Sequence, residues 1–189
     1  MTNIVILASG NGSNAQRIIE YFFGNKQVCF SFVITNKEDA YVRQRAENLG
    51  IQSVYLSKNE ITQTDILLSL LKENQIDWVV LAGFLLLIPS NVILAYKNRI
   101  INIHPALLPN YGGKGMYGMR VHEAVIANKE KESGITIHYV NEKYDEGNII
   151  FQAKCAIDKN DTPETLASKI HLLEHEYFPK VLEELIIGK

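Results

Sequence analysis

Cysteine is scarce in this chain, which has two in 189 residues. Cys29 and Cys155 each lie in an apolar run, and neither has a second cysteine or a histidine at the spacing of a zinc site. We expect both thiols to be reduced, as in a cytoplasmic protein. This composition excludes a small secreted fold that depends on disulfides.

Long apolar runs and an excess of one charge are missing as well. The longest run, residues 78–88, contains a glycine and is too short to span a bilayer. The first strand is expected to begin within three residues of the N-terminus, so no signal peptide is expected. With a formal net charge of −2 and no basic stripe, the chain is expected to bind neither nucleic acid nor a membrane.

What the chain does have is a regular alternation of apolar runs and helical patterns. Hydrophobic residues make up 47% of the sequence, enough for the core of one domain. Near-continuous apolar strands that alternate with amphipathic helices are typical of a parallel sheet with helices on both faces. Such strands are expected at 3–9, 28–35, 51–56, 77–83 and 99–104.

The pattern changes after residue 134. Two strand-like runs, 135–140 and 149–154, have no helix between them, which predicts an antiparallel hairpin at the edge of the sheet. We therefore expect a single α/β domain over residues 1–189. Its sheet should be Rossmann-like, open, twisted and mostly parallel, with this hairpin at its C-terminal edge.

A long C-terminal helix is expected to follow the hairpin. Thr162 suits its N-cap, and Pro163 suits its first helical position. The apolar spacing predicts a buried stripe at Leu166, Ile170, Leu173 and Tyr177.

A glycine-rich turn, SGNGSN at residues 9–14, joins the first strand to the first helix. Such a turn presents backbone N–H groups and a helix N-terminus to an anion. The third glycine of a dinucleotide fingerprint is missing, because Asn14 follows Gly12 and Ser13. The turn therefore favours a single phosphate of a small substrate. The alternative is a tight turn that needs glycine for backbone reasons alone.

Two polar residues interrupt the end of the strand IINIH, which runs directly into Pro105. Asn102 and His104 are two residues apart, so their side chains should face the same space beyond the carboxyl end of a parallel strand. An amide can stabilise an oxyanion and an imidazole can transfer a proton. The alternative is that both residues only tie down the loop that follows.

Asp145, in the loop of the hairpin, is a candidate partner for His104. A carboxylate beside an imidazole favours the protonated ring and raises its pKa. Taken alone, Asp145 is equally compatible with a solvated loop. His138 alternates with apolar residues on a strand, and His171 and His175 are four apart on a helix without the further ligand that a metal site needs.

Together these residues resemble the glycinamide ribonucleotide transformylases, that is, the phosphoribosylglycinamide formyltransferases of purine biosynthesis. The resemblance runs in order through NIVILASGNGSN, DWVVLAGF, INIHPALLP, YDEGNIIFQAK and LLEHEYFP, and so covers nearly the whole chain. The segment NIHPALLP and the downstream Asp-x-Gly are shared by the wider folate-dependent formyltransferase superfamily. The early GNGSN turn indicates the glycinamide ribonucleotide branch.

The resemblance implies roles for particular residues. The catalytic residues would be Asn102, His104 and Asp145. The substrate-binding residues would be Gly12, Ser13, Asn14, His171 and Glu174. The folate-binding residues would be Lys58, Leu85, Leu86, Leu87, Ile88, Asn102, Asn141, Glu142, Lys143, Tyr144 and Asp145. Phosphate binding is thus expected in about residues 1–100, and folate binding and catalysis in about residues 101–189.

The implied reaction transfers a formyl group from 10-formyltetrahydrofolate to the amine of glycinamide ribonucleotide. Asn102 and protonated His104 would stabilise the oxyanion, and Asp145 would keep His104 charged and help to relay the proton through water. No metal is implied. The resemblance also suggests a cis peptide bond before Pro109 and leaves monomer or homodimer open.

The chain departs from better-known members of this family in two places. Residues 111–124 are longer than the short form of the family, and their glycines permit either an ordered wall or a lid. Leu86 stands where some members carry arginine, which bears on affinity for the folate tail.

Four other functions are weighed against this one. A formyltetrahydrofolate hydrolase would need a regulatory module and a methionyl-tRNA formyltransferase a basic C-terminal domain, and neither is expected in this chain. A non-catalytic nucleotide-binding module would explain the glycine-rich turn, but not the agreement at Asn102, His104 and Asp145. A dehydrogenase is disfavoured by the missing glycine.

Overall fold

The buried residues of the first strand alternate between two separate hydrophobic clusters. In the computed structural model, which describes residues 1–188, Ile4 and Ile6 of β1 (Thr2–Leu7) pack in one cluster. Val5 and Leu7 pack in the other. Because successive side chains of a strand point to opposite faces, this strand is buried on both faces, as its near-continuous apolar run predicts.

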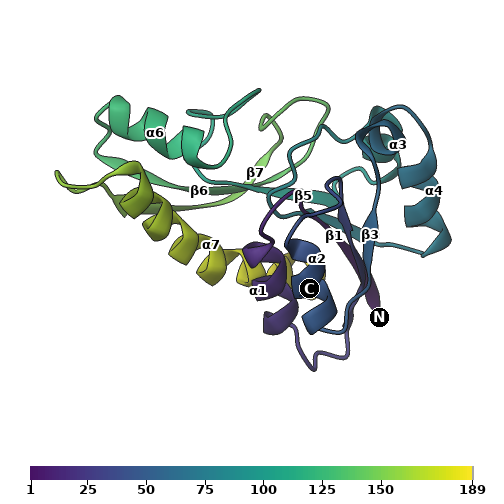
Figure 1. Ribbon diagram of the computed structural model, residues 1–189. Coiled ribbons are helices and arrows are strands. Elements are labelled where there is room, and N and C mark those ends of the chain that lie inside the picture. The colour runs from purple at the N-terminus through teal and green to yellow at the C-terminus, as the bar shows by residue number, and fades with distance from the viewer. Residues whose placement is uncertain (189) are drawn as a thin grey trace.

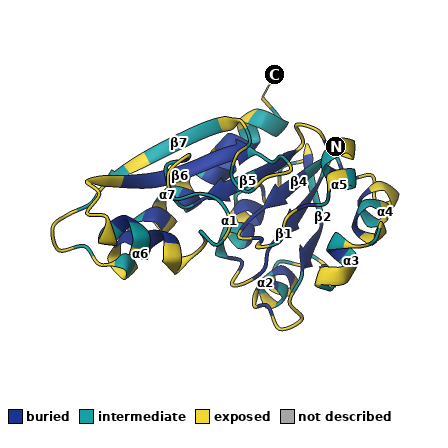
Figure 2. Ribbon diagram, turned by 90° about the horizontal axis from the view of Figure 1, so that it is seen from above, coloured by how far each residue is buried: buried dark blue, intermediate teal, exposed yellow. Residues whose placement is uncertain are grey.

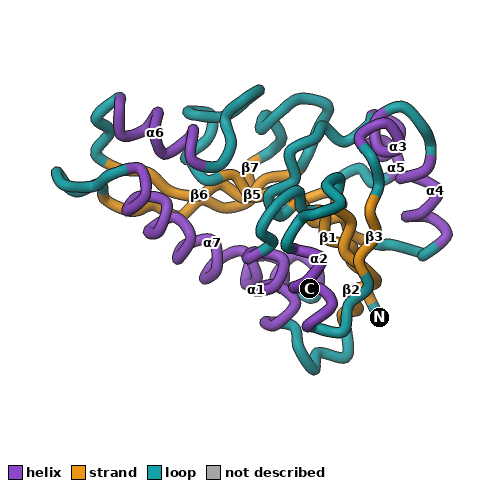
Figure 3. Tube along the Cα trace, in the orientation of Figure 1, coloured by secondary structure: helices purple, strands orange, loops and turns teal. Residues whose placement is uncertain are grey.

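Helices supply the other side of each cluster. Buried residues of α1 (Ser13–Tyr21), α2 (Val42–Asn48), α6 (Met119–Ala127) and α7 (Pro163–Ile186) belong to the first cluster. Those of α3 (Lys58–Thr62), α4 (Ile66–Glu73) and α5 (Ser90–Ala95) belong to the second. Figures 1 and 3 show α1, α2 and α7 on one side, with α3 and α4 at the other end of the sheet.

The sheet has seven strands in the order β3-β2-β1-β4-β5-β6-β7. The first five strands in this order are parallel to one another. Besides β1 they are β2 (Val28–Thr35), β3 (Ser53–Tyr55), β4 (Trp78–Leu81) and β5 (Ile100–His104). Strands β6 (Glu132–Tyr139) and β7 (Ile149–Ala156) are antiparallel. The predicted fold, with its edge hairpin, is confirmed, and Figure 2 shows the outermost strand β7 less buried than β6.

The C-terminal helix begins as predicted but buries a different stripe. The Thr162 side chain accepts a hydrogen bond from the Thr165 backbone, which caps the helix. The prediction was right for Leu166 and Ile170, whereas Leu173 and Tyr177 are only half-buried. The buried stripe continues through Glu174 and Phe178 instead. Glu174 is a charged residue at a buried position of the helix. The apolar spacing therefore did not identify this position and assigned the neighbouring apolar residues to the buried stripe instead.

Several smaller expectations can be compared with the structure. Cys29 and Cys155 are free thiols and are half-buried. The peptide bond between Leu108 and Pro109 is cis. Within residues 1–188, no helix is long and apolar enough to cross a membrane. The bounds of helix α6 were not predicted, and the division into two functional halves stays a prediction.

Candidate active site

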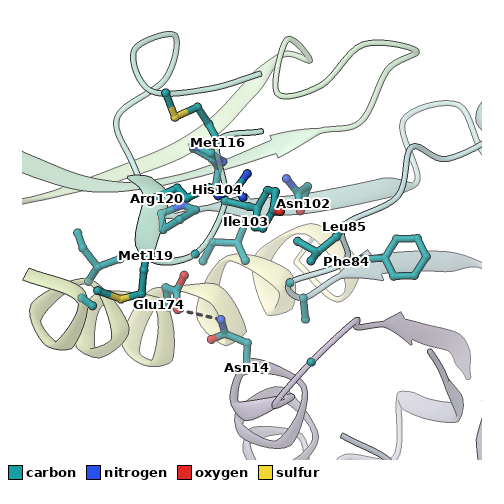
Figure 4. Close-up of a pocket in the computed structure, with 18 of the residues that line it drawn as sticks. Asn14, Phe84, Leu85, Asn102, Ile103, His104, Met116, Met119, Arg120 and Glu174 are labelled. Atoms are coloured by element: carbon teal, nitrogen blue, oxygen red, sulfur yellow. Dashed lines mark hydrogen bonds between the residues drawn. The ribbon is translucent and has the colours of Figure 1, made fainter. Parts of the chain in front are cut away.

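A cleft of about 740 Å³ lies beyond the carboxyl ends of the central parallel strands, where ligands bind in open α/β sheets. Its walls come from segments that are far apart in the sequence. They are residues 10–14, 82–85, 102–105, 113–120, His122, residues 144–145 and one side of α7. Figure 4 shows Asn102 and His104 on one wall and Asn14 across from them.

The glycine-rich turn forms one end of the cleft. Gly12 has a φ of 77°, and a Cβ atom placed on it would lie 2.9 Å from the Val42 backbone. Both the positive φ and this close approach require glycine. Helix α1 begins at Ser13, so its first N–H groups have no partner within the helix and can bind an anion.

Helix α7 contributes two further predicted substrate residues to this end. The Asn14 amide donates to Glu174 Oε2 over 2.9 Å, an interaction drawn in Figure 4. His171 Nδ1 lies 2.9 Å from the same oxygen, and its Nε2 lies 3.5 Å from Ser13 Oγ. The hydrogen bond to Glu174 raises the pKa of His171. The structure thus brings four of the five predicted substrate residues into direct contact, and Gly12 completes the turn.

The predicted catalytic residues gather at the other end of the cleft. Asp145, which has a φ of 56° in the loop between β6 and β7, accepts a hydrogen bond from the Gly113 N–H at 3.0 Å. Its Oδ2 lies 3.5 Å from His104 Nδ1. The Asn102 amide donates to its other oxygen over 3.4 Å. A loop 41 to 43 residues downstream therefore reaches back to the end of β5.

The protonation of His104 differs from the sequence expectation. Its Nε2 donates to the Tyr111 carbonyl over 2.8 Å, so the neutral ring has its lone pair on Nδ1, facing Asp145. Only 3% of His104 is exposed, and this burial lowers its pKa. The charge of Asp145 raises the pKa of His104, as the sequence predicts, but the effect of burial is larger. The net shift of this pKa is therefore downward, because of a burial that the sequence does not show.

Asp145 itself is held in its charged form. Burial raises the pKa of this carboxyl, but the neighbouring His138, the positive charge that His104 carries whenever it is protonated, and the Gly113 N–H together lower the pKa below the ordinary value. The lowered pKa of each group favours a charged carboxylate beside a neutral imidazole, whose Nδ1 can accept a proton.

Only part of the predicted folate site lines the cleft. Leu85 and Tyr144 do so, together with Asn102 and Asp145. Lys58 lies on α3, away from the lining. The remaining predicted folate residues are also outside it, namely Leu86, Leu87, Ile88, Asn141, Glu142 and Lys143. Their role in folate binding stays a prediction.

Some residues of the cleft were not among the predicted site residues. The segment 113–120, for which the sequence permits either a wall or a lid, lines one side of the cleft. His122 is 5% exposed, and its Nδ1 has no hydrogen-bond partner among the described residues. The sequence does not indicate that His122 faces the cleft, because nothing in it places α6 there.

Within residues 1–188, no three His, Cys, Asp or Glu side chains are grouped as metal ligands. The rings of His171 and His175 stack with centroids 5.3 Å apart, and His171 is engaged with Glu174. Of these two histidines, only His171 lines the cleft.

Comparison with known proteins adds to this geometry. A family model described as "Formyl transferase" matches residues 2–182. Phosphoribosylglycinamide formyltransferase of Bacillus subtilis is 35% identical over an alignment of 191 positions, which covers 98% of this chain and 95% of that protein. The chloroplastic phosphoribosylglycinamide formyltransferase of Arabidopsis thaliana is 39% identical over 185 residues, or 95% of this chain. This chain spans 63% of the length of that plant protein.

The fold is likewise similar to solved structures. The crystal structure of phosphoribosylglycinamide formyltransferase from Streptococcus pneumoniae TIGR4 superposes with a TM-score of 0.86 at 34% identity. The match covers 98% of this chain and 99% of that one. Sequence and fold therefore indicate the same relatives.

Proposed function

This chain belongs to the formyl transferase family, and we propose that it transfers a formyl group from 10-formyltetrahydrofolate to the amine of 5-phosphoribosylglycinamide, a step of de novo purine biosynthesis. The names of its relatives indicate the acceptor, and the family indicates the reaction type. The folate cosubstrate is the donor that the sequence resemblance implies.

One observation carries the proposal. A single cleft has an anion-binding turn at one end and the cluster of Asn102, His104 and Asp145 at the other. A phosphorylated amine bound with its phosphate at the turn would extend its amine toward this cluster. The formyl donor would then enter beside Leu85 and Tyr144, which line the same end.

The protonation of His104 suggests how the reaction proceeds. The amine attacks the formyl carbon, a C–N bond forms, and negative charge builds on the formyl oxygen. The neutral Nδ1 of His104 takes the proton that the amine loses, and the imidazolium so formed is stabilised by Asp145. This new positive charge stabilises the oxyanion, and the proton passes to the folate nitrogen as its bond to the formyl carbon breaks.

The substrate phosphate would be held by backbone and side chain together. The N–H groups at the start of α1 supply dipoles, and protonated His171 supplies a positive charge next to Ser13. Cytoplasmic location and the monomer-or-dimer alternative stay predictions.

A formyl-transfer assay tests the proposal. The purified chain is given both substrates, and formylated product and free formate are measured separately. His104→Ala should reduce kcat by about 10²–10⁴, the usual contribution of a proton-transferring group. Leu94→Ala, a change at a 73% exposed side chain on α5, is the matched control and should leave the rate unchanged.

The other outcomes distinguish the alternatives. Formate without formylated product would indicate a hydrolase. Folate binding without either product would indicate a binding module, and the roles of Asn102 and His104 would then be structural.

A further inference from the structure

His138 lies directly across the sheet from Asn102. In the antiparallel pairing of β5 with β6, Asn102 is opposite His138 and His104 is opposite Thr136. Side chains directly opposite one another on antiparallel strands lie on the same face and within contact distance. His138 is 2% exposed, and nothing in the proposed reaction has so far required a histidine there.

The two ring nitrogens of His138 have different partners. Nδ1 lies 2.8 Å from the backbone oxygen of Tyr139, and a carbonyl oxygen can only accept, so Nδ1 carries a proton. In the neutral ring Nε2 is then an acceptor. It lies 3.0 Å from the Asn102 side-chain nitrogen, which donates to it.

Asp145 fixes the same end of the Asn102 amide. The second N–H of that nitrogen points to Asp145 Oδ1 at 3.4 Å. A carboxylate accepts and cannot donate, so the amide oxygen cannot occupy this position. Both neighbours therefore require the nitrogen of Asn102 to face them, and the amide oxygen is the end without a hydrogen-bond partner among the described residues.

We propose that His138 is a positioning residue that holds the Asn102 amide with its N–H groups toward His138 and Asp145 and its oxygen toward the cleft. On the proposed function, that oxygen accepts an N–H of the attacking amine and aims the nitrogen lone pair at the formyl carbon. The amine gains positive charge as it attacks, so this hydrogen bond strengthens in the transition state. Asn102 is thereby assigned to orienting the amine, while His104 takes the proton of the amine and then stabilises the oxyanion.

The neighbouring cross-strand pair, His104 with Thr136, offers a comparison with a residue whose role is only structural. Thr136, opposite His104, donates to the Ala106 carbonyl at 2.6 Å and accepts from the Leu108 N–H at 3.0 Å. These bonds secure the loop after β5 and touch no member of the catalytic cluster. His138 instead contacts Asn102 and lies 3.7 Å from Asp145.

The tautomer of His138 can be measured without any substrate. Nitrogen-15 NMR of histidine-labelled protein distinguishes protonated from unprotonated ring nitrogens, and the chain has five histidines to assign. The signals of His138 are those lost in the His138→Gln variant. We expect a proton on Nδ1 and none on Nε2. A proton on Nε2 would overturn the proposed amide orientation, even if the enzyme assay behaves as proposed.

Matched variants test the positioning role. Glutamine can present a side-chain oxygen near the place of Nε2, whereas phenylalanine fills the space without an acceptor. We expect His138→Phe to lower kcat by about a hundredfold with little change in KM, the cost of a misplaced reacting group, and His138→Gln to retain kcat within severalfold. Ser133→Ala, a buried change on the same strand away from the cleft, controls for loss of packing.

Each result has a separate meaning. A folded His138→Phe variant with wild-type kcat would overturn the proposal, as would equal losses in the Phe and Gln variants. If His138→Phe fails to fold, the kcat of the His138→Gln variant and the tautomer of His138 still test the positioning role. If the wild-type chain transfers no formyl group, the proposed function fails, while NMR still tests the hydrogen bond to Asn102.

Discussion

At one end of the cleft the ligand-facing groups are backbone N–H groups of the 10–14 turn, whereas at the other they are the side chains of Asn102, His104 and Asp145. The backbone end needs only a glycine with positive φ and the start of a helix, which lie side by side in the sequence. The side-chain end needs a strand terminus, its antiparallel neighbour and a distant loop. The first end can therefore be recognised locally, and the second depends on the completed fold.

The two ends should also fail differently when changed. Altering a backbone site weakens ground-state binding, which raises KM. Altering a group that acts on the moving proton weakens only the transition state, which lowers kcat. The predictions below test this division, from the largest expected effect to the smallest.

The largest effect is expected for Asp145→Asn. Removing the charge takes away the stabilisation of the imidazolium that forms on His104, so kcat should fall by about 10²–10⁴ while KM for the phosphorylated substrate stays nearly constant. Glu146→Gln, the same change of charge at an exposed position one residue away, should have little effect. Steady-state kinetics of both variants checks this, and a comparable loss in Glu146→Gln would contradict it.

Gly12→Ala should chiefly affect binding and folding. The positive φ and the approach to the Val42 backbone strain any side chain at this position, at a cost of about 1–3 kcal/mol in the free energy of unfolding. The displaced turn should raise KM for the phosphorylated substrate about tenfold or more, with kcat less affected. Thermal melting and kinetics measure the two effects. Gly24→Ala, also at positive φ but with open space around it, controls for backbone strain alone.

The pH dependence of substrate binding should follow His171. Its pKa is raised by Glu174, so the protonated ring persists above the ordinary value of about 6.5 and is lost as pH rises through the raised pKa. KM for the phosphorylated substrate should therefore rise severalfold over this interval. In His171→Gln the KM should be higher at low pH and nearly constant with pH. A wild-type KM that falls as pH rises would count against this role.

The smallest effect is expected far from both ends. Asp161 bonds Lys169 at 2.6 Å, and this interaction lowers its pKa to about 2. Asp161→Asn should lower the melting temperature by only about 1–3 °C at neutral pH, because Lys169 is partly exposed and keeps its second ion pair, with Asp158. A depressed pKa gives stability that is present above the ordinary value and is lost as pH falls, so the difference should vanish near pH 2. Both kcat and KM should be unchanged.

The sequence was sufficient for the fold because each feature of the fold has a local cause. The apolar run of β1 reports burial on both faces, and the two runs without a helix between them report the hairpin of β6 and β7. The turn at Gly12 was recognisable for the same reason. Asn102 and His104 stood out because polar side chains ended an apolar strand.

The remainder of the site depends on information that a single sequence does not carry. The pairing of His138 with Asn102 is set by the register between β5 and β6, which the strand pattern leaves open. The depressed pKa of His104 is set by burial under the 111–120 segment and its neighbours, which outweighs the carboxylate visible in the sequence. Glu174 interrupts the apolar pattern of the buried face of α7, because its carboxylate binds Asn14 in the cleft.

The division between the two ends is tested most directly by measuring kcat and KM for formyl transfer in Asp145→Asn and Gly12→Ala in one assay. The account predicts that Asp145→Asn lowers kcat with KM nearly unchanged, and that Gly12→Ala raises KM with a much smaller change in kcat. If both variants change the same parameter to the same degree, the two ends of the cleft do not have separate roles and the account is wrong.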